Sequence, residues 1–559
     1  MGSVGRLENF PWPDSQHPGF LFQPAENIRV RLDDRQKNFA LDRIDSGGRS
    51  AVLAREHHLT ENCAKPPASR DGSWVEFSWC DGRLSITTDR LGTIPVFWCW
   101  DGDTLLFSSR MTDLAAAQRK APSPNIAAAR EMIFFDYTTG NETLLEGVSL
   151  LPSASACTPQ HDGTFATNKY WAPPAVEECR VEDIEPWVEE TVAVLSSAHG
   201  RHGFADSEGL ALPVTAGLDS RCNLALQRHH LSKAHLFHCH DLGRVELPYA
   251  RRITRELALP LNVYDSGPSM RHVTEEAVNL GPGDFNLGHW RLVGIARQLA
   301  ANGVTSTIDG FFQDLLFKAT FLREAQPEHQ VGGKIAEARY KARKAGLGEK
   351  LADSLAERLY SECREGENGL DFSQRFYIEN RSRRLVCNIV RLNRNYLCVR
   401  APALDAQLMD YGLALPWQLR KDSYLYRRII HRLDAKLAAI PYDKTGLPLL
   451  DPRRRSWKKQ AARTLRPYLD RAWPGRPFLQ VPEGNFARLA RRDDVFRSLV
   501  GDLLARSEWL RDVLADDHPA RMLISGNRMG QAAVDCLGGM LTVAKLELAA
   551  AWTEKGRGS

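Results

Sequence analysis

The segment 212–221, Leu-Pro-Val-Thr-Ala-Gly-Leu-Asp-Ser-Arg, most strongly limits what this chain can fold into. Its apolar start is typical of a strand, and the small residues Ala216 and Gly217 allow the backbone to turn tightly into a helix. The unpaired N–H groups and the positive dipole end of that helix would favour an anion. An ordinary strand-to-helix turn, with Asp219 or Ser220 as the helix cap, remains an equal alternative.

The length of 559 residues exceeds what one hydrophobic core usually organises, so we expect at least two domains. A hydrophobic fraction of 43% with 25% charged residues is ordinary for a soluble globular protein. The net charge of +4 is small beside 73 basic and 69 acidic side chains, so it gives no indication of a nucleic-acid partner, and we expect none.

The eleven cysteines are scattered singly, without a C-x-x-C pair or a Cys/His cluster at metal-ligand spacing. This pattern favours reduced thiols in a cytoplasm over a disulfide framework or a zinc site. Residues 1–6 do not resemble a signal peptide, and no apolar stretch approaches the length needed to span a bilayer. We therefore expect a cytoplasmic protein without a membrane partner.

The first part of the chain, to about residue 172, has short strand-like runs separated by Gly, Asp and Pro. Asp81-Gly82 and Asp101-Gly102 are typical hairpin turns, which indicates an antiparallel sheet domain. The expected strands are 74–80, 84–88, 96–100 and 105–108, and the expected helices are 111–117 and 126–134.

Pro173 and Pro174 interrupt any helix or central strand, so we place a domain boundary there, between 1–174 and 175–559. Beyond it, strand-like runs alternate with helical patterns, which predicts a parallel sheet covered on both faces. The expected fold is α/β: an α+β N-terminal antiparallel sandwich, then a parallel-sheet domain with a helical C-terminal part. The expected strands are 209–214, 234–239, 261–264 and 304–308, and the expected helices between them are 220–230, 245–257 and 289–301.

Ligands of such sheets bind beyond the carboxyl ends of the strands, where 215–220 and 309–314 fall. From about residue 335 the pattern is mostly helical. The basic run 453–459 is more typical of a solvated surface than of a phosphate contact. The expected C-terminal helices are 385–396, 424–437, 494–504 and 532–552.

The segment 215–220, Thr-Ala-Gly-Leu-Asp-Ser, resembles the Ser-Gly-Gly-x-Asp-Ser pyrophosphate loop of ATP-pyrophosphatase domains. The segment 89–98, which includes Arg90 and Gly92, resembles part of the glutaminase-type domain of glutamine amidotransferases, although a buried turn held by an Asp–Arg pair is the alternative. The whole chain resembles the asparagine synthetase family, which includes β-lactam synthetases and the macrolactam cyclases of lasso peptides. Further similar segments are 249–252, the acidic loop 309–317 and the Arg-x-Pro-x-Leu-Asp segment 400–405.

This resemblance implies that the chain uses ATP and Mg2+. Asp219 and Asp314 would hold the metal, since Mg2+ prefers oxygen ligands and borrows the rest from phosphates. A substrate carboxylate would be adenylated, and an amine would then displace AMP to form an amide. The implied nucleotide-binding residues are Val214, Thr215, Ala216, Gly217, Leu218, Asp219, Ser220 and Gly310.

Lys444, in the segment 440–446, falls where the family carries a lysine that stabilises charge in this reaction. The resemblance therefore implies three catalytic residues, Lys444, Asp219 and Asp314. A solvated turn lysine is the alternative at position 444.

Several residues depart from the family pattern. Gly2 stands where the family has its nucleophilic cysteine, so we expect a degenerate class II (Ntn-type) domain that does not hydrolyse glutamine. Phe311 stands where asparagine synthetases have Glu and β-lactam synthetases have Tyr. Cys398 stands where the family has Glu. Pro213 removes an N–H from an expected central strand. Tyr377 and Glu379 are possible replacement groups, although ordinary surface roles are the more expected.

Three functions follow from this resemblance. The leading one is an ATP-dependent, AMP- and pyrophosphate-forming amide synthetase that closes a ring in a natural product or lasso peptide. Its substrate would be a small molecule or peptide carrying a carboxylate and an amine, with a precursor-peptide delivery protein or a protease as a possible partner. The alternatives are an ammonia- or glutamine-dependent asparagine synthetase and a catalytically inactive ATP-binding scaffold.

Overall fold

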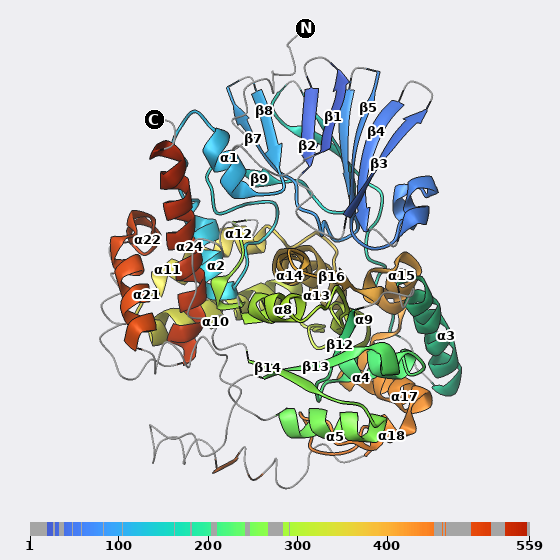
Figure 1. Ribbon diagram of the computed structural model, residues 1–559. Coiled ribbons are helices and arrows are strands. Elements are labelled where there is room, and N and C mark those ends of the chain that lie inside the picture. The colour runs from blue at the N-terminus through green and yellow to red at the C-terminus, as the bar shows by residue number, and fades with distance from the viewer. Residues whose placement is uncertain are drawn as a thin grey trace.

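The computed structural model of the chain contains antiparallel sheets at one end and a parallel sheet at the other (Figure 1). The mixed α/β class predicted from the sequence is confirmed. The described residues are 20–555 except for 26–27, 33–38, 47–48, 57–58, 82, 103, 161, 179–181, 203–208, 241–245, 266–282, 290, 452–460, 462–463, 466–493 and 516–530.

The antiparallel part has a six-stranded sheet in the order β11-β10-β6-β5-β4-β3, a three-stranded sheet β8-β7-β9 and the pair β1-β2. All four strands predicted here are present within one residue at each end, because each is a short apolar run bounded by turn residues. The strands are β1 Phe20–Ala25, β2 Ile28–Leu32, β3 Phe39–Ser46, β4 Arg49–Glu56, β5 Trp74–Cys80, β6 Arg83–Thr88, β7 Phe97–Asp101, β8 Thr104–Ser108, β9 Ser149–Leu150, β10 Ser155–Pro159 and β11 Phe165–Lys169.

The two predicted hairpins differ slightly in their turns. Cys80 pairs with Arg83, so the first chain reversal follows Cys80 and includes Asp81, as predicted. In the second hairpin Asp101 still pairs with Thr104, so Asp101 belongs to the strand and the turn starts one residue later than predicted, at Gly102. Gly102 has a φ of +64°, the left-handed conformation that glycine adopts without strain.

The turn after β6 is held by Asp89, but not by pairing with Arg90. The Asp89 carboxylate accepts hydrogen bonds from the backbone N–H groups of Leu91 and Thr93, both at 3.0 Å. Arg90 instead reaches Asp410 at 2.8 Å, in helix α15 (Ala406–Ala414). The alternative prediction, a turn held by an Asp89–Arg90 pair, is therefore wrong, because the acidic partner of Arg90 is Asp410. Arg90 thus connects the antiparallel part to the helical part.

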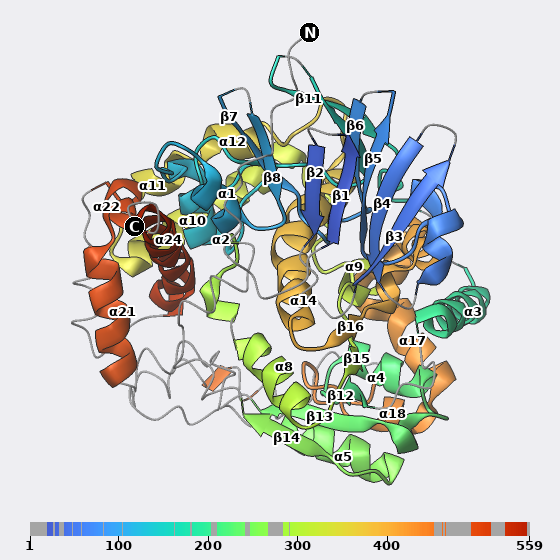
Figure 2. The same cartoon turned by 45° about the horizontal axis from the view of Figure 1, so that its top comes forward.

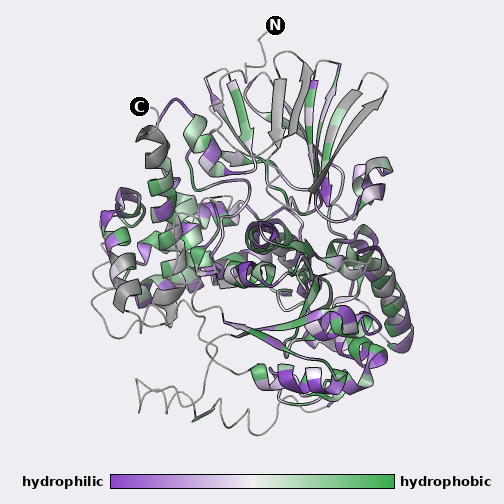
Figure 3. Ribbon diagram, viewed as in Figure 1, coloured by the Kyte–Doolittle hydropathy of each residue, from purple (hydrophilic) through white to green (hydrophobic). Residues whose placement is uncertain are grey.

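The second sheet is fully parallel, in the order β14-β13-β12-β15-β16. The four strands predicted here are confirmed, while the three-residue strand β16 was not predicted. Helix α5 carries hydrophobic and hydrophilic residues in stripes, as expected for a helix that covers a sheet (Figure 3). The strands and connecting helices are β12 Leu210–Pro213, α4 Leu218–Leu226, β13 His235–His240, α5 Leu247–Leu257, β14 Asn262–Asp265, α8 Arg291–Ala301, β15 Ser306–Ile308 and β16 Cys398–Arg400.

The sheet accommodates Pro213, which has no N–H, because the hydrogen-bonded pairing of β12 with β15 ends before this position. Val214 donates its N–H to Phe237 of β13 at 2.7 Å, and successive residues of a strand point to alternate neighbours, so position 213 faces β15. The register between β12 and β15 reaches only Ala211 opposite Thr307. The proline therefore removes no hydrogen bond of the sheet and lies where β12 and β15 separate.

The remaining chain is mostly helical. The predicted helix 424–437 is interrupted at Asp434, whose side chain caps α18, and the basic run 453–459 lies outside the described residues. The other helices are α1 Met111–Ala117, α2 Ile126–Phe135, α3 Glu185–His202, α9 Gln313–Phe317, α10 Pro327–Ala345, α11 Lys350–Asp353, α12 Ala356–Tyr360, α13 Gly369–Phe376, the π-helix η5 Tyr377–Val386, α14 Cys387–Arg394, α16 Trp417–Arg420, α17 Tyr424–Leu433, α18 Ala435–Ala439, α21 Asp494–Arg506, α22 Glu508–Val513 and α24 Gln531–Lys555.

The C-terminal helix α24 packs against α2 and α10, so one hydrophobic cluster joins residues on both sides of the predicted domain boundary. Figures 1 and 2 show α24 beside α1 and α2, and α14 between the two kinds of sheet. The boundary at residue 174 falls between the end of β11 at Lys169 and the start of α3 at Glu185, and the division into two domains stays a prediction. Among the helices that the structure describes, none is both long and apolar enough to cross a bilayer.

The hydrogen bonds of Arg420 in α16 test how much the contacts between α16, α9 and α13 contribute to the stability of the fold. Its buried guanidinium donates to Leu315 O at 2.7 Å and to Gln374 Oε1 at 2.8 Å. Replacing Arg420 by Met leaves these acceptors unpaired, so we expect a loss of about 2–4 kcal/mol in unfolding free energy. Urea denaturation measures it, with Arg251→Met on the exposed side of α5 as the matched control. Equal midpoints for the two variants would contradict this role.

Candidate active site

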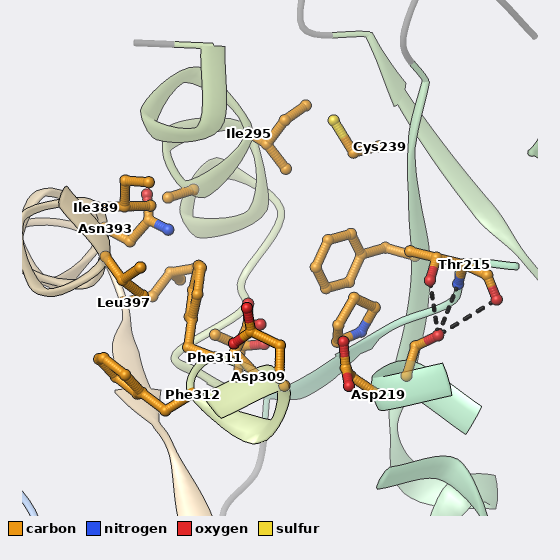
Figure 4. A pocket seen from close by; sticks show the side chains of 18 of the residues that line it. Thr215, Asp219, Cys239, Ile295, Asp309, Phe311, Phe312, Ile389, Asn393 and Leu397 are labelled. Carbon is orange, nitrogen blue, oxygen red and sulfur yellow. Dashed lines mark hydrogen bonds between the residues drawn. The ribbon is translucent and has the colours of Figure 1, made fainter. Parts of the chain in front are cut away.

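The loop between β12 and α4 is closed by its own hydroxyl groups. The Thr215 and Ser220 hydroxyls lie 2.7 Å apart (Figure 4). The Thr215 hydroxyl also accepts the N–H of Gly217 at 3.1 Å. Gly217 is the residue before the first turn of α4, so the loop delivers the positive end of a nine-residue helix to the space beyond the strand. The predicted strand–loop–helix arrangement is confirmed.

The second loop follows β15 and lies against the first. A Cβ at Gly310 would be 2.5 Å from the Cβ of Asp219, so only glycine allows the two loops to approach this closely. Phe312 has a φ of +69°, and α9 begins immediately after it. Because β12 and β15 are neighbours in the sheet, Asp219 and Asp314 reach the same cavity.

Asp219 is bound by a cation from this chain. The Lys318 ammonium lies 2.5 Å from Asp219 Oδ2, and the Tyr426 hydroxyl donates more weakly to Oδ1 at 3.3 Å. Burial raises the pKa of the Asp219 carboxyl above its ordinary value; Lys318 opposes this rise and the negative charge of Asp314 adds to it.

Asp314 belongs to a second polar chain. The Tyr377 hydroxyl donates to Asp314 Oδ2 at 2.9 Å and accepts from Arg381 at 2.6 Å. The Tyr377 ring stacks on Phe321 at 4.0 Å, and burial raises the pKa of its hydroxyl, so the neutral phenol is the form present. Within the described residues, no carboxylate lies within ion-pair distance of Arg381.

Asp309 is the third carboxylate of the site. Burial raises its pKa to about 7; the N–H groups of Gly310 and Phe311 oppose this rise, and the charge of Asp219 adds to it. The Asp309 and Asp219 carboxylates point into the same space in Figure 4. Asp309 therefore changes its charge near neutral pH.

A cavity of about 460 Å³ opens in front of these loops. It lies against the sheet face that carries Pro213, Phe237 and Thr307, because alternate side chains of a strand share a face. Helices α8 and α14 supply much of its apolar wall, including Ile295 and Ile389. One end of the cavity is thus charged and the other mainly apolar.

The structure brings together Thr215, Ser220, Gly310 and both metal-ligand candidates, Asp219 and Asp314, which all line the cavity. The other predicted nucleotide-binding residues belong to the same loop but are not lining residues. The side chains of Val214, Ala216 and Leu218 are fully buried, so only the backbone of these three can meet a ligand.

Lys444 is exposed and does not line the cavity. Arg221 of α4 donates to the backbone oxygens of Ile440 and Pro441, at 2.6 and 2.7 Å, and so holds the segment before Lys444 beside the first loop. Burial raises the pKa of Tyr442, two residues before Lys444, and the charges of Asp443 and Asp219 add to this rise. The catalytic role of Lys444 stays a prediction.

Sequence reasoning missed Lys318 and Arg381 and gave Asp309 no role of its own. The four-residue spacing between Asp314 and Lys318 would suggest a pair between these two side chains, whereas Lys318 is bound to Asp219, so no signal in the sequence indicated its role. Tyr377, for which a surface role was the more expected, is instead bound to Asp314. Glu379 pairs with Lys169 at 2.7 Å and is not a lining residue, so nothing in its position supports a replacement base.

The residues present fit a metal ion held jointly with phosphate. Within the part of the chain that the structure describes, no group of three or more His, Cys, Asp or Glu side chains could hold a metal alone. Asp219 and Asp314 are two oxygen donors beside a loop suited to phosphate, and Gly310 lets the second loop approach Asp219 closely. This donor set is what Mg2+ requires when phosphates complete its coordination.

Residues 73–171 match the family model of a glutamine amidotransferase domain. This match fits the asparagine synthetase family for the N-terminal part and suggests an enzyme of the amidotransferase kind. No curated protein matches the chain.

The cysteines described within the matched segment are Cys80, Cys99 and Cys157. Burial raises the pKa of the Cys99 and Cys157 thiols to about 11, so neither is a thiolate at neutral pH, and Cys80 is exposed. Gly2 lies outside the described residues, and the expectation that this domain does not hydrolyse glutamine stays a prediction.

The raised pKa of Asp309 predicts a pH-dependent stability. Between about pH 4 and 7 the unfolded carboxyl is ionised while the folded one keeps its proton, so stability falls as the pH rises through this window. Asp309→Asn removes the effect, and we expect it to gain up to roughly 4 kcal/mol relative to the native chain between pH 4 and 8. Urea midpoints in metal-free buffer measure this gain. The exposed control Asp353→Asn should show none, and parallel curves for Asp309→Asn and the native chain would refute the assignment.

Proposed function

We propose that the protein is an ATP-dependent synthetase that adenylates a carboxylate and joins it to an amine, with release of pyrophosphate and AMP. The observation that carries this proposal is the placement of Asp219 and Asp314, which follow neighbouring parallel strands and line one cavity with Thr215 and Ser220. The glutamine amidotransferase match in the N-terminal part agrees with an asparagine synthetase-like chain.

Mg2+, when bound, neutralises phosphate charge and supplies Lewis-acid chemistry at the phosphates. The chain itself binds the phosphates through the Thr215 and Ser220 hydroxyls and the first N–H groups of α4. The Arg381 guanidinium faces the same cavity and attracts anionic groups of the substrates. The apolar wall offers few hydrogen-bond partners to water beside an activated acid, which favours attack by the amine over hydrolysis.

The apolar wall also favours one substrate class over another. Phe311 lines the cavity with Ile295 and Ile389, which suits an acid with an apolar body better than aspartate, whose side chain is itself charged. We therefore favour a natural-product or peptide substrate that carries both carboxylate and amine and closes into a ring. An asparagine synthetase is the second candidate, and its support is the amidotransferase match.

The test is ATP–pyrophosphate exchange and AMP formation with a panel of carboxylic acids and linear peptides. We expect activity with apolar acids, and a loss of at least about a hundredfold in Asp219→Ala and Asp314→Asn, since each removes charge stabilisation at the phosphates. Asp353→Asn, exposed on α11, is the matched control and should keep full activity.

Three outcomes decide between the candidates. AMP formation that requires aspartate and ammonia would instead establish the asparagine synthetase. Tight ATP–Mg2+ binding without exchange for any acid would indicate an inactive scaffold. Exchange that survives Asp219→Ala would contradict the assigned site.

A further inference from the structure

Lys318 lies where a divalent cation would bind to Asp219. Its ammonium is 2.5 Å from Asp219 Oδ2, its side chain is only 13% exposed, and both residues line the cavity. Its backbone N–H donates to the carbonyl of Asp314 at 3.2 Å, which fixes the start of this side chain beside the second carboxylate. Within the described residues, Asp219 is the one acidic partner of Lys318.

Lys318 offsets a charge that the rest of the site leaves unbalanced. Asp219 and Asp314 face one cavity, and their repulsion contributes to the raised pKa of Asp219. The other contact of the Asp219 carboxylate, with the Tyr426 hydroxyl, is long at 3.3 Å and neutral. The Lys318 ammonium is therefore the main charge that stabilises ionised Asp219 before any ligand enters.

A divalent cation and the Lys318 ammonium cannot share Asp219 Oδ2. The two positive groups would lie within a few ångströms of each other in a site of low dielectric, where their repulsion is large. Arg381 does not offer a similar exchange, because its bound partner is the neutral Tyr377 hydroxyl. A lysine has a flexible four-carbon stem and is a good point-charge ligand for phosphate.

We propose that Lys318 is a switching cation: it occupies the divalent-metal position on Asp219 in the nucleotide-free protein, and it moves to a phosphate oxygen of the nucleoside triphosphate when the metal binds. The move of Lys318 to a phosphate oxygen rests on the proposed function. The competition between Lys318 and a metal ion for Asp219 does not, and it holds for any ligand that brings a divalent cation.

The experiment measures two affinities in Lys318→Met. Mn2+ binding without nucleotide is followed by the electron paramagnetic resonance signal of free Mn2+, and binding of α,β-methylene-ATP with Mn2+ is followed by calorimetry. Loss of the competing ammonium should tighten Mn2+ binding, and loss of the phosphate contact should weaken nucleotide binding, each by roughly fivefold to tenfold. Shifts in opposite directions separate this role from simple structural damage, which would weaken both.

Two further variants control the result. Lys233→Met removes an exposed lysine and should leave both affinities unchanged. Lys318→Arg keeps the positive charge and should retain weak Mn2+ binding, which keeps the proposal testable if Lys318→Met does not fold. Unchanged or weaker Mn2+ binding in Lys318→Met overturns the proposal. Tighter Mn2+ binding with no nucleotide binding in the native chain overturns the proposed function while the exchange on Asp219 stands.

Discussion

One continuous helical segment, Gly369–Arg394, connects the antiparallel part of the chain to the cavity, and its middle part is the π-helix η5. On one side, Arg383 donates to the backbone oxygen of Leu151 and Arg384 to that of Glu142, both in the antiparallel part. On the other side, Arg381 faces the cavity and Tyr377 is bound to Asp314. A π-helix widens the backbone spiral and is often found at functional sites, and here it lets one segment serve both parts. The antiparallel part therefore fixes the position of the groups that hold Asp314, whether or not it has chemistry of its own.

The cavity lies where β12 and β15 separate. Their ladder ends at Ala211, before Pro213, and Gly310 allows the following loops to meet where a larger residue would clash. Pro213 and Gly310 both lie at the carboxyl edge of a parallel sheet, where helix dipoles also point. Backbone geometry thus creates the space, and the side chains of α8 and α14 decide how apolar its far wall is.

Features that depend on residues near one another in the chain could be predicted from the sequence. Features that depend on contacts between distant residues could not. Strand β5 was predicted to the residue, and the turn into α4 was recognised, because apolar runs and small residues act locally. Strand β16 has only three residues, too few for an alternation of apolar and polar residues to be recognised. The partner of Arg90 is 320 positions away, and the adjacent acid, Asp89, suggested the wrong pair. Lys318 acquires its role only because the end of α9 approaches Asp219 of α4, and Arg381 because η5 approaches Asp314 of α9; no periodicity encodes either approach.

The charged side chains around the cavity favour a ligand that carries positive charge, such as a nucleotide bound to a divalent cation. Three carboxylates, Asp219, Asp309 and Asp314, line it, against two cationic side chains, Lys318 and Arg381. Burial holds the proton on Asp309 up to about pH 7, so the site carries little net charge below that pH and becomes negative above it. Above that pH the net negative charge would repel a triphosphate alone, whereas a triphosphate with a divalent cation brings the positive charge that offsets the carboxylates. The burial that raises the pKa of Asp219 and of Asp309 also strengthens the electrostatic interactions of the site, since both effects come from the low local dielectric.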